Sequence, residues 1–213
     1  MNPRALAVVL CSLGALAGCG GAETLDPVAH DEPVATYTGR IAGSDAVFAV
    51  LAGPVDVALY VCGGPTTYSA VSHWFSGSRE VGSAHVNLTS DEGATAELTL
   101  EDETLAGRVE DTTGELGLRA DRAPEDGISG LYGALDAGCR TGVVVWREEG
   151  AEAASVQGTW CSDTGIFAQV TPIAPVESPA DVASGLAVSV VSVSPDVPER
   201  QLVVFPVVPT DLR

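Results

Sequence analysis

Apolar and polar residues alternate almost strictly between Ala84 and Glu101. A period of two places successive side chains on opposite faces of a β-strand, so the runs 84–89 and 94–101 each predict a strand with one buried and one solvated face. An apolar period of three to four residues, which would indicate an amphipathic helix, persists nowhere over the length of an ordinary helix. The sequence therefore predicts an all-β fold.

The loop between these two runs predicts how they pair. Residues 91–93, Asp-Glu-Gly, form a three-residue connection with glycine where a left-handed backbone is needed. Folding the chain about the middle of this loop places Leu88 opposite Ala96. The same register places Val86 opposite Leu98. All four side chains then share the buried face, so the pattern and the turn agree on one register.

The alternation continues through two further strands, which are joined by a turn at 111–114. Their expected inward positions are Leu105, Gly107, Val109, Leu116, Leu118 and Ala120. Strands that follow one another with short turns form an antiparallel up-and-down meander with one solvated face. We expect this meander to be barrel-like, with a two-sheet sandwich as the alternative.

The earlier part of the β-domain shows the same pattern with a weaker phase. Strands are expected over 46–51, 55–61 and 68–77. In the second of these runs one face carries Val55, Val57, Leu59 and Val61. The antiparallel β-domain as a whole is expected to cover residues 36–173.

The composition changes after this domain. Residues 174–184 are rich in proline and small residues and predict a linker. Two apolar runs within 185–213 then predict a C-terminal β-hairpin that either completes the sheet or packs on it. Pro206 lies in the last run, and because proline donates no hydrogen bond to a ladder, this strand is expected at an edge or with a bulge.

Two parts of the chain resemble each other weakly. Tyr37 precedes Cys62 by 25 residues and Tyr132 precedes Cys161 by 29, with strand-like runs between them. A duplicated half is one interpretation. The other, which we favour, is that β-meanders resemble one another because they share one periodicity.

The N-terminus has the pattern of an export signal. Arg4 precedes an uncharged run, 5–17, that is too short to cross a bilayer as a helix. This run ends in Leu16-Ala17-Gly18-Cys19, which resembles the lipobox of bacterial lipoproteins. The resemblance implies that residues 1–18 are removed as a signal peptide and that Cys19 is lipidated. The alternative is an ordinary signal peptide that is cut a few residues later.

A lipid on Cys19 implies how the protein is held. Residues 19–35 then form a disordered tether that spans up to about 50 Å. The expected location is the cell envelope, in the periplasm, at the outer membrane or at the cell surface. Gly20 is not the aspartate that resembles an inner-membrane retention signal, so sorting to an outer membrane is allowed.

The charge of the chain limits its partners. All ten basic residues are arginines, and without residues 1–18 nine arginines face 29 acidic residues, a net charge of −20. A field of this sign repels nucleic acid phosphates and anionic lipid headgroups. We therefore expect no nucleic acid partner, and contact with a membrane only through the lipid on Cys19.

Three cysteines remain after Cys11 and Cys19 are assigned to the signal peptide and the lipid. Folding the chain about Gly150 places Cys139 directly opposite Cys161, close to the separation that a disulfide needs. The sequence therefore predicts a Cys139–Cys161 disulfide and leaves Cys62 as a free, partly buried thiol.

The sequence contains few candidates for chemistry. A Cys62 nucleophile with His73 as its base is the strongest, but no basic residue near Cys62 in the sequence would lower its pKa. Catalytic motifs, calcium loops and metal-ligand clusters are not found, so we expect no catalytic residues, metal or cofactor. Trp74, Trp146 and Trp160 are expected in the core or at the ends of a barrel, the alternative being an exposed pair that binds a sugar or peptide.

Three short motifs carry a further resemblance. Tyr37-Thr38-Gly39, the run 60–64 (Tyr-Val-Cys-Gly-Gly) and the run 74–77 (Trp-Phe-Ser-Gly) are similar to a loosely defined set of secreted and envelope β-domains. The resemblance covers about residues 36–135 and implies a β-fold but no activity.

The sequence leaves three functions open. We expect a lipid-anchored envelope protein that acts as a non-enzymatic binding or structural module. The first alternative is a carrier that holds a small apolar ligand inside its barrel. The second is a hydrolase.

Overall fold

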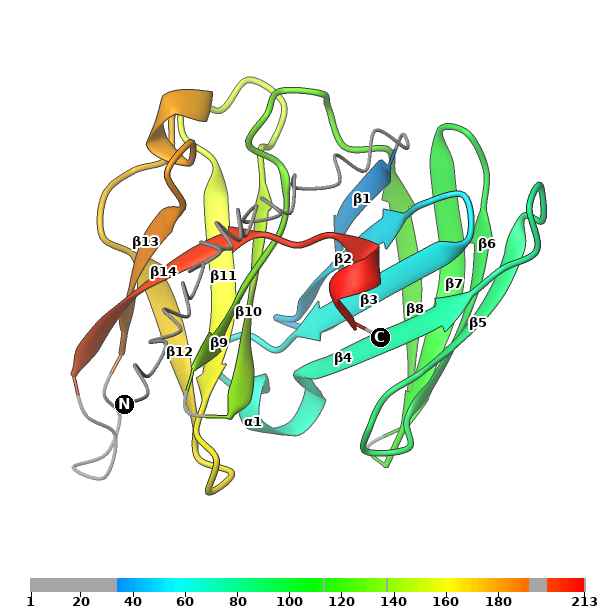
Figure 1. The fold of residues 1–213 in the computed structure, drawn as a ribbon, viewed down its shortest axis with the longest axis horizontal. Coiled ribbons are helices and arrows are strands. Elements are labelled where there is room, and N and C mark those ends of the chain that lie inside the picture. The colour runs from blue at the N-terminus through cyan, green and yellow to red at the C-terminus, as the bar shows by residue number, and fades with distance from the viewer. Residues whose placement is uncertain (1–33, 113, 137, 192–198, 213) are drawn as a thin grey trace, which may run out of the picture. The chain divides into compact units, whose positions relative to one another are not determined.

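The computed structural model describes residues 34–112, 114–136, 138–191 and 199–212, and Figure 1 shows its fourteen strands. The strands form two antiparallel sheets in which neighbours in the chain are neighbours in space. The prediction of an all-β, up-and-down, barrel-like fold is confirmed. The predicted signal peptide, Cys19 and nearly all of the predicted tether lie outside the described residues.

The first sheet has eight strands in the order of the chain. They are β1 (Ala35–Arg40), β2 (Val47–Ala52), β3 (Asp56–Cys62), β4 (His73–Ser78), β5 (His85–Thr89), β6 (Thr95–Leu100), β7 (Thr104–Asp111) and β8 (Gly114–Asp121). The two outer strands approach each other, because Tyr37 forms a bridge with Arg122 and the amide of Ala123 donates to the carbonyl of Thr36 at 2.8 Å. This sheet is therefore nearly closed.

The predicted register of the β5–β6 hairpin is confirmed. Leu88 pairs with Ala96 and Val86 pairs with Leu98, and all four side chains are buried. Gly93 in the loop has a φ of 88°, in the left-handed region that favours glycine. The local pattern and the turn residue were sufficient to determine this pairing.

The strand expected over 68–77 is only partly present. Its first residues form a short helix, α1 (Tyr68–Val71), and β4 begins at His73. The carboxylate of Asp45 accepts hydrogen bonds from the amide and hydroxyl of Thr66 and from the hydroxyl of Thr67. These contacts hold the turn before α1 and explain why the apolar pattern alone was misleading. Val55 was expected to share a face with Val57, Leu59 and Val61, but it precedes β3 and is exposed, whereas those three are buried.

The second sheet is a closed barrel of six strands. They are β9 (Gly130–Asp136), β10 (Cys139–Trp146), β11 (Ser155–Cys161), β12 (Phe167–Pro172), β13 (Leu186–Val190) and β14 (Arg200–Pro206). Within the predicted linker lies a 3₁₀ turn, η1 (Pro179–Asp181), and a second, η2 (Pro209–Leu212), follows β14.

The strands of the predicted C-terminal hairpin complete this second barrel. β13 pairs with β12 and β14, and β14 pairs with β9 through Phe205–Gly133 and Pro206–Tyr132. β14 is therefore not an edge strand, which was one of the two expectations for Pro206. Proline is tolerated because it is the last residue of β14 and lies beyond the pairs with β13, which end at Val204.

Apolar side chains form three clusters. One fills the first sheet and includes Phe48, Leu59 and Phe75, and one fills the barrel and includes Val143 and Trp160. A third cluster joins the two sheets and consists of Val47, Ala49, Leu51, Ala58, Tyr60, Cys62, Leu131 and Val144. β2 is consequently buried on both faces, as is most of β3, one face toward each cluster.

Candidate functional site

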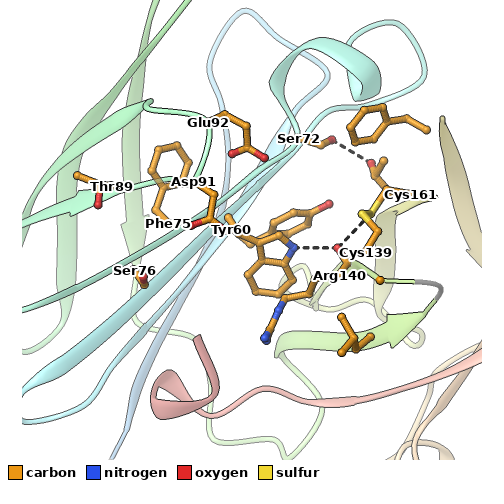
Figure 2. A pocket seen from close by; sticks show the side chains of 15 residues that line it. Tyr60, Ser72, Phe75, Ser76, Thr89, Asp91, Glu92, Cys139, Arg140 and Cys161 are labelled. Atoms are coloured by element: carbon orange, nitrogen blue, oxygen red, sulfur yellow. Dashed lines mark hydrogen bonds between the residues drawn. A yellow bond between two sulfur atoms is a disulfide. The ribbon is translucent and has the colours of Figure 1, made fainter. Parts of the chain in front are cut away.

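A cleft of about 510 Å³ opens at the junction of the two sheets. The first sheet contributes Ser72, parts of β3, β4 and β5, and the β5–β6 loop. The barrel contributes the β9–β10 turn and parts of β9, β10, β11 and β12. Figure 2 shows Glu92 and Asp91 on one side of the cleft and Cys139, Arg140 and Cys161 on the other. A volume of this size is typical of small-molecule sites.

The cleft has an aromatic wall. The rings of Tyr60 and Trp74 pack with their centroids 4.5 Å apart and their planes tilted by 32°. Gly142 on β10 lies against both rings, since a Cβ atom there would overlap Tyr60 and lie 2.8 Å from Trp74. The absence of a side chain at this position lets the barrel approach the first sheet closely.

Polar contacts connect the same wall to the barrel. The indole Nε1 of Trp74 donates a 3.1 Å hydrogen bond to the carbonyl of Arg140, whose guanidinium carbon lies 5.6 Å from the indole centroid. The hydroxyls of Ser72 and Thr159 share a 3.0 Å hydrogen bond. Thr159 is 3% exposed, so the cleft has a fixed polar wall as well as an apolar one.

Tyr60 and Cys62 are polar groups held in their uncharged forms. Tyr60 is 2% exposed, and burial raises the pKa of its hydroxyl well above the usual value. Cys62 is free and fully buried, 3.5 Å from the hydroxyl of Thr159, and burial raises the pKa of its thiol to about 11. A thiol with this pKa is a poor nucleophile at neutral pH.

The structure does not bring Cys62 and His73 together. His73 pairs with Val61 in the β3–β4 ladder, so the two side chains share the face that packs inside the first sheet. Cys62 follows Val61 and therefore points to the opposite face, toward the barrel. His73 instead lies 3.7 Å from a carboxylate oxygen of Glu92 and 3.8 Å from one of Asp111.

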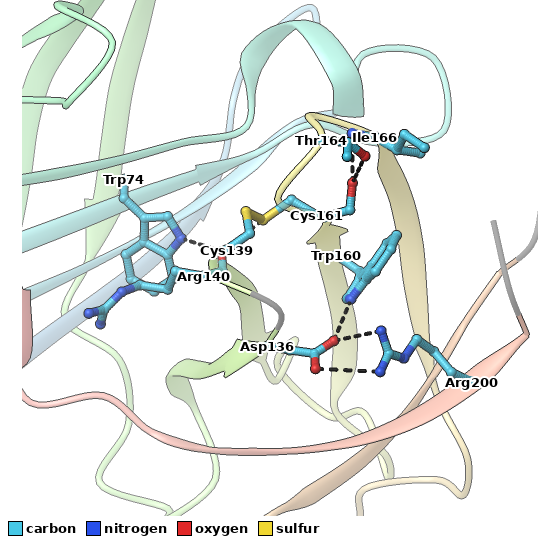
Figure 3. The surroundings of a disulfide bond; sticks show 10 residues. Trp74, Asp136, Cys139, Arg140, Trp160, Cys161, Thr164, Ile166 and Arg200 are labelled. Atoms are coloured by element: carbon cyan, nitrogen blue, oxygen red, sulfur yellow. Dashed lines mark hydrogen bonds and ion pairs between the residues drawn. A yellow bond between two sulfur atoms is a disulfide. The ribbon is translucent and has the colours of Figure 1, made fainter. Parts of the chain in front are cut away.

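The predicted Cys139–Cys161 disulfide is present, with Cα atoms 5.7 Å apart (Figure 3). The register that suggested it is wrong by one residue, because Gly142 pairs with Thr159 and not with Gly158. The β10–β11 ladder ends at this pair, before either cysteine is reached. Beyond the ladder the two strands are no longer paired residue by residue, so the two sulfur atoms can approach each other despite the shift of one residue.

The other two tryptophans pack elsewhere. Trp160 is buried in the barrel, and its Nε1 donates a 3.0 Å hydrogen bond to Asp136, which also forms a 2.8 Å ion pair with Arg200 (Figure 3). Trp146 packs against the third cluster and lies 5.4 Å from the guanidinium carbon of Arg40. The expected packing role fits both residues, whereas Trp74 lines the cleft.

Sequence reasoning missed the cleft itself. Its polar residues, such as Ser72, Glu92 and Thr159, are far apart in the chain and form no motif. A usable signal was Gly142 in the apolar run of β10, since glycine in a strand often marks a close approach. A Cβ atom there would collide with Tyr60 and Trp74 of the first sheet.

The described residues contain neither a membrane-spanning helix nor a cluster of metal-binding side chains. Within the described ranges, no helix has the length and apolar character needed to cross a membrane. Groups of three or more histidine, cysteine or acidic side chains suited to a metal are likewise not found in the part of the chain that the structure covers.

Known proteins offer no guide to the cleft. Comparisons of the chain with models of protein families, with curated proteins and with solved structures each find no match.

Proposed function

We propose that the protein is a non-enzymatic binding module of the cell envelope, attached to a membrane by a lipid on Cys19 and using the cleft as its binding site. The observation that carries the proposal is the combination of aromatic, hydroxyl and charged side chains around one cleft at the junction of the two sheets. Sites for small molecules typically combine apolar walls with a few fixed polar groups.

The cleft supports binding more than catalysis. The free thiol of Cys62 is buried, with a raised pKa, and faces away from His73. A nucleophile needs a base within hydrogen-bond reach, and this pair lacks that geometry. The hydrolase alternative therefore has no support from Cys62.

The interior of the barrel is a less suitable place for a ligand. Val143, Val188 and Val204 are fully buried there and pack with Trp160 in a single cluster. A carrier of a small apolar ligand needs a lined cavity at this position. The cleft, which is open to solvent, is the better candidate.

Two features support the proposed location. The sequence Leu16-Ala17-Gly18-Cys19 resembles a lipobox. The Cys139–Cys161 disulfide is compatible with an oxidising, extracytoplasmic compartment, where such bonds persist. Both features fit a protein that is exported and then retained at a membrane.

A fragment screen by ligand-observed NMR on the purified protein tests the binding site. Thr89 lines the cleft on β5, and Thr95 is its cross-strand partner outside the cleft; both are exposed. We expect Thr89→Gln to weaken most fragment hits and the matched variant Thr95→Gln to leave them unchanged. Hits that are equally insensitive to both substitutions would show that the cleft is not the binding site.

A further inference from the structure

The charges that line the cleft are unevenly placed. Asp91 and Glu92 lie at the tip of the β5–β6 loop, and both are exposed. Arg140 is the one arginine among the described lining residues, and Figure 2 shows it across the cleft from this acidic pair. The cleft lining therefore carries two carboxylates and one guanidinium group.

Arginines elsewhere do not compensate this pair. Among the described residues, the arginine ion pairs involve other acids, such as Glu97 with Arg108 and Asp136 with Arg200. The ionisable side chain that contacts Glu92 is His73, at 3.7 Å. Placing a cation beside Asp91 and Glu92 would thus gain Coulomb energy without breaking an arginine pair.

An uncharged part of the cleft wall also suits an N–H donor. Ser72 and Thr159 place hydroxyl oxygens at the cleft, and Thr159 is buried and held by its contacts with Ser72 and Cys62. Hydroxyl oxygens retain lone pairs that accept hydrogen bonds. An ammonium group in the cleft would have hydroxyl as well as carboxylate acceptors in the same lining.

The charge of the whole chain acts in the same direction. The sequence has a net charge of −19 at pH 7, and a field of that sign raises the local concentration of cations and repels anions. The remaining walls include Trp74, Phe167 and the disulfide, which provide apolar contact for a carbon chain. Size, charge and apolar surface thus point to one class of molecule.

We propose that the ligand of the cleft is a small organic cation, with alkyl ammonium or guanidinium groups that bind at Asp91 and Glu92 and a carbon chain that contacts Trp74 and Phe167. This inference rests on the proposed binding function and names its ligand class. The proposed ligand site is the cleft alone, and the outer faces of the two sheets are not part of it.

A series of eight-carbon probes isolates the charge requirement. We would titrate the purified protein with 1,8-diaminooctane, 1,8-octanediol and suberate by calorimetry in about 150 mM salt, which screens exposed charges beyond about 8 Å. The expected result is that the diamine binds at least about tenfold more tightly than the diol, a difference of about 1.4 kcal/mol, and that suberate binds least. Equal affinity for the diol, or no binding of the diamine, overturns the inference.

Two charge-matched variants locate the effect. Asp91→Asn/Glu92→Gln should weaken binding of the diamine about tenfold or more, whereas Asp102→Asn/Glu103→Gln, in the exposed loop between β6 and β7, should change it less than about threefold. Asp91→Asn alone keeps the contact between His73 and Glu92 and checks that the loop is intact. Equal losses in both double variants would indicate non-specific attraction and overturn the site.

The outcome also separates this inference from the proposed function. If the diol binds as well as the diamine and Thr89→Gln weakens both, the cleft is a binding site but its ligand is not a cation. If the fragment hits and all three probes are insensitive to Thr89→Gln, both proposals fail.

Discussion

The indole of Trp74 on β4 donates a hydrogen bond to the main-chain carbonyl of Arg140 on β10, so one side chain ties the first sheet to the barrel at the edge of the cleft. Arg140 follows Cys139, whose disulfide fixes the β9–β10 turn to β11. The position of Trp74 therefore depends on a covalent link in the other sheet. Changes at this junction should affect both stability and the shape of the cleft.

Gly142 provides the most direct test of the junction. Gly142→Ala should lower the free energy of unfolding by about 2 kcal/mol, because the new methyl group overlaps the ring of Tyr60 and crowds Trp74. Urea unfolding followed by tryptophan fluorescence measures the change. Gly117→Ala on β8 is the matched control, since nothing lies within 4 Å of its Cβ position. Equal effects of the two substitutions would contradict the close approach at Gly142.

The disulfide should contribute measurably to stability. Cys139 and Cys161 are separated by 22 residues, and closing a loop of this length is worth about 3 kcal/mol in the chain-entropy account. Unfolding of the wild type with and without a reductant measures this contribution. The variant Cys139→Ala/Cys161→Ala should be insensitive to the reductant. A non-reducing peptide map that pairs Cys62 with either cysteine would contradict this assignment.

Cys62 should be inert in the folded protein. Burial raises the pKa of its thiol to about 11, so labelling by iodoacetamide at pH 8 should be much slower in the native state than in urea. In the unfolded chain the thiol ionises at the usual pKa of 9.0, whereas in the folded protein its pKa is about 11. The contribution of Cys62 to the free energy of unfolding is therefore full below pH 9.0, decreases above it and is lost as the pH passes 11. Rapid native labelling of Cys62 would revive the nucleophile hypothesis.

Asp45 should stabilise the turn before α1 in a pH-dependent way. Burial alone would raise the pKa of this carboxyl, but hydrogen bonds from Thr66, Thr67 and Gly64 outweigh it and lower the pKa to about 2. Its contribution is present above the ordinary value of 3.8 and disappears as the pH falls through 2.

The substitution Asp45→Asn isolates this contribution. It should lower the free energy of unfolding by about 1 kcal/mol near neutral pH, because its hydrogen bonds are no longer charge-assisted. The difference from the wild type should shrink as the pH approaches 2. A difference that is constant from pH 2 to 6, or as large for Asp102→Asn in an exposed turn, would rule out this role.

The proposed lipid anchor can be tested on the intact chain. Cys19→Ser should abolish incorporation of an alkyne-labelled fatty acid and release the protein from the membrane fraction. Cys11→Ser, in the same apolar run, should leave both unchanged, because that residue is removed with the proposed signal peptide. Fatty acid labelling that persists in Cys19→Ser would place the modification elsewhere or exclude the lipobox.

The sequence predicts those parts of the fold that depend on neighbours in the chain. The β5–β8 meander follows from alternation because each strand has one solvated face, and a turn glycine such as Gly93 fixes the register. The run from Val47 to Ala52 lacks this alternation because both faces of β2 are buried. Its second partner, around Val144, is distant in the sequence and has no local signal.

The candidate site, like the fold, could be predicted from the sequence only in part. The sequence predicts the Cys139–Cys161 disulfide from a register that is wrong by one residue. The disulfide still forms because both cysteines lie just beyond the end of the ladder, where the strands are not held in that register. Tyr37 and Tyr132, which suggested a weak internal repeat, lie in the first strand of each sheet. The cleft arises only where the two sheets meet, so no single stretch of sequence contains it.

The pairing of β14 with β9 determines the order in which the protein can be completed. Each strand from β1 to β8 meets its partners as soon as its neighbours have been synthesised. β9 must wait for Phe205 and Pro206, near the end of the chain, before its second edge is covered. Until then the apolar interior of the barrel is open to solvent, a state prone to misassembly. β14, the last strand that the structure describes, is thus the one that closes the barrel.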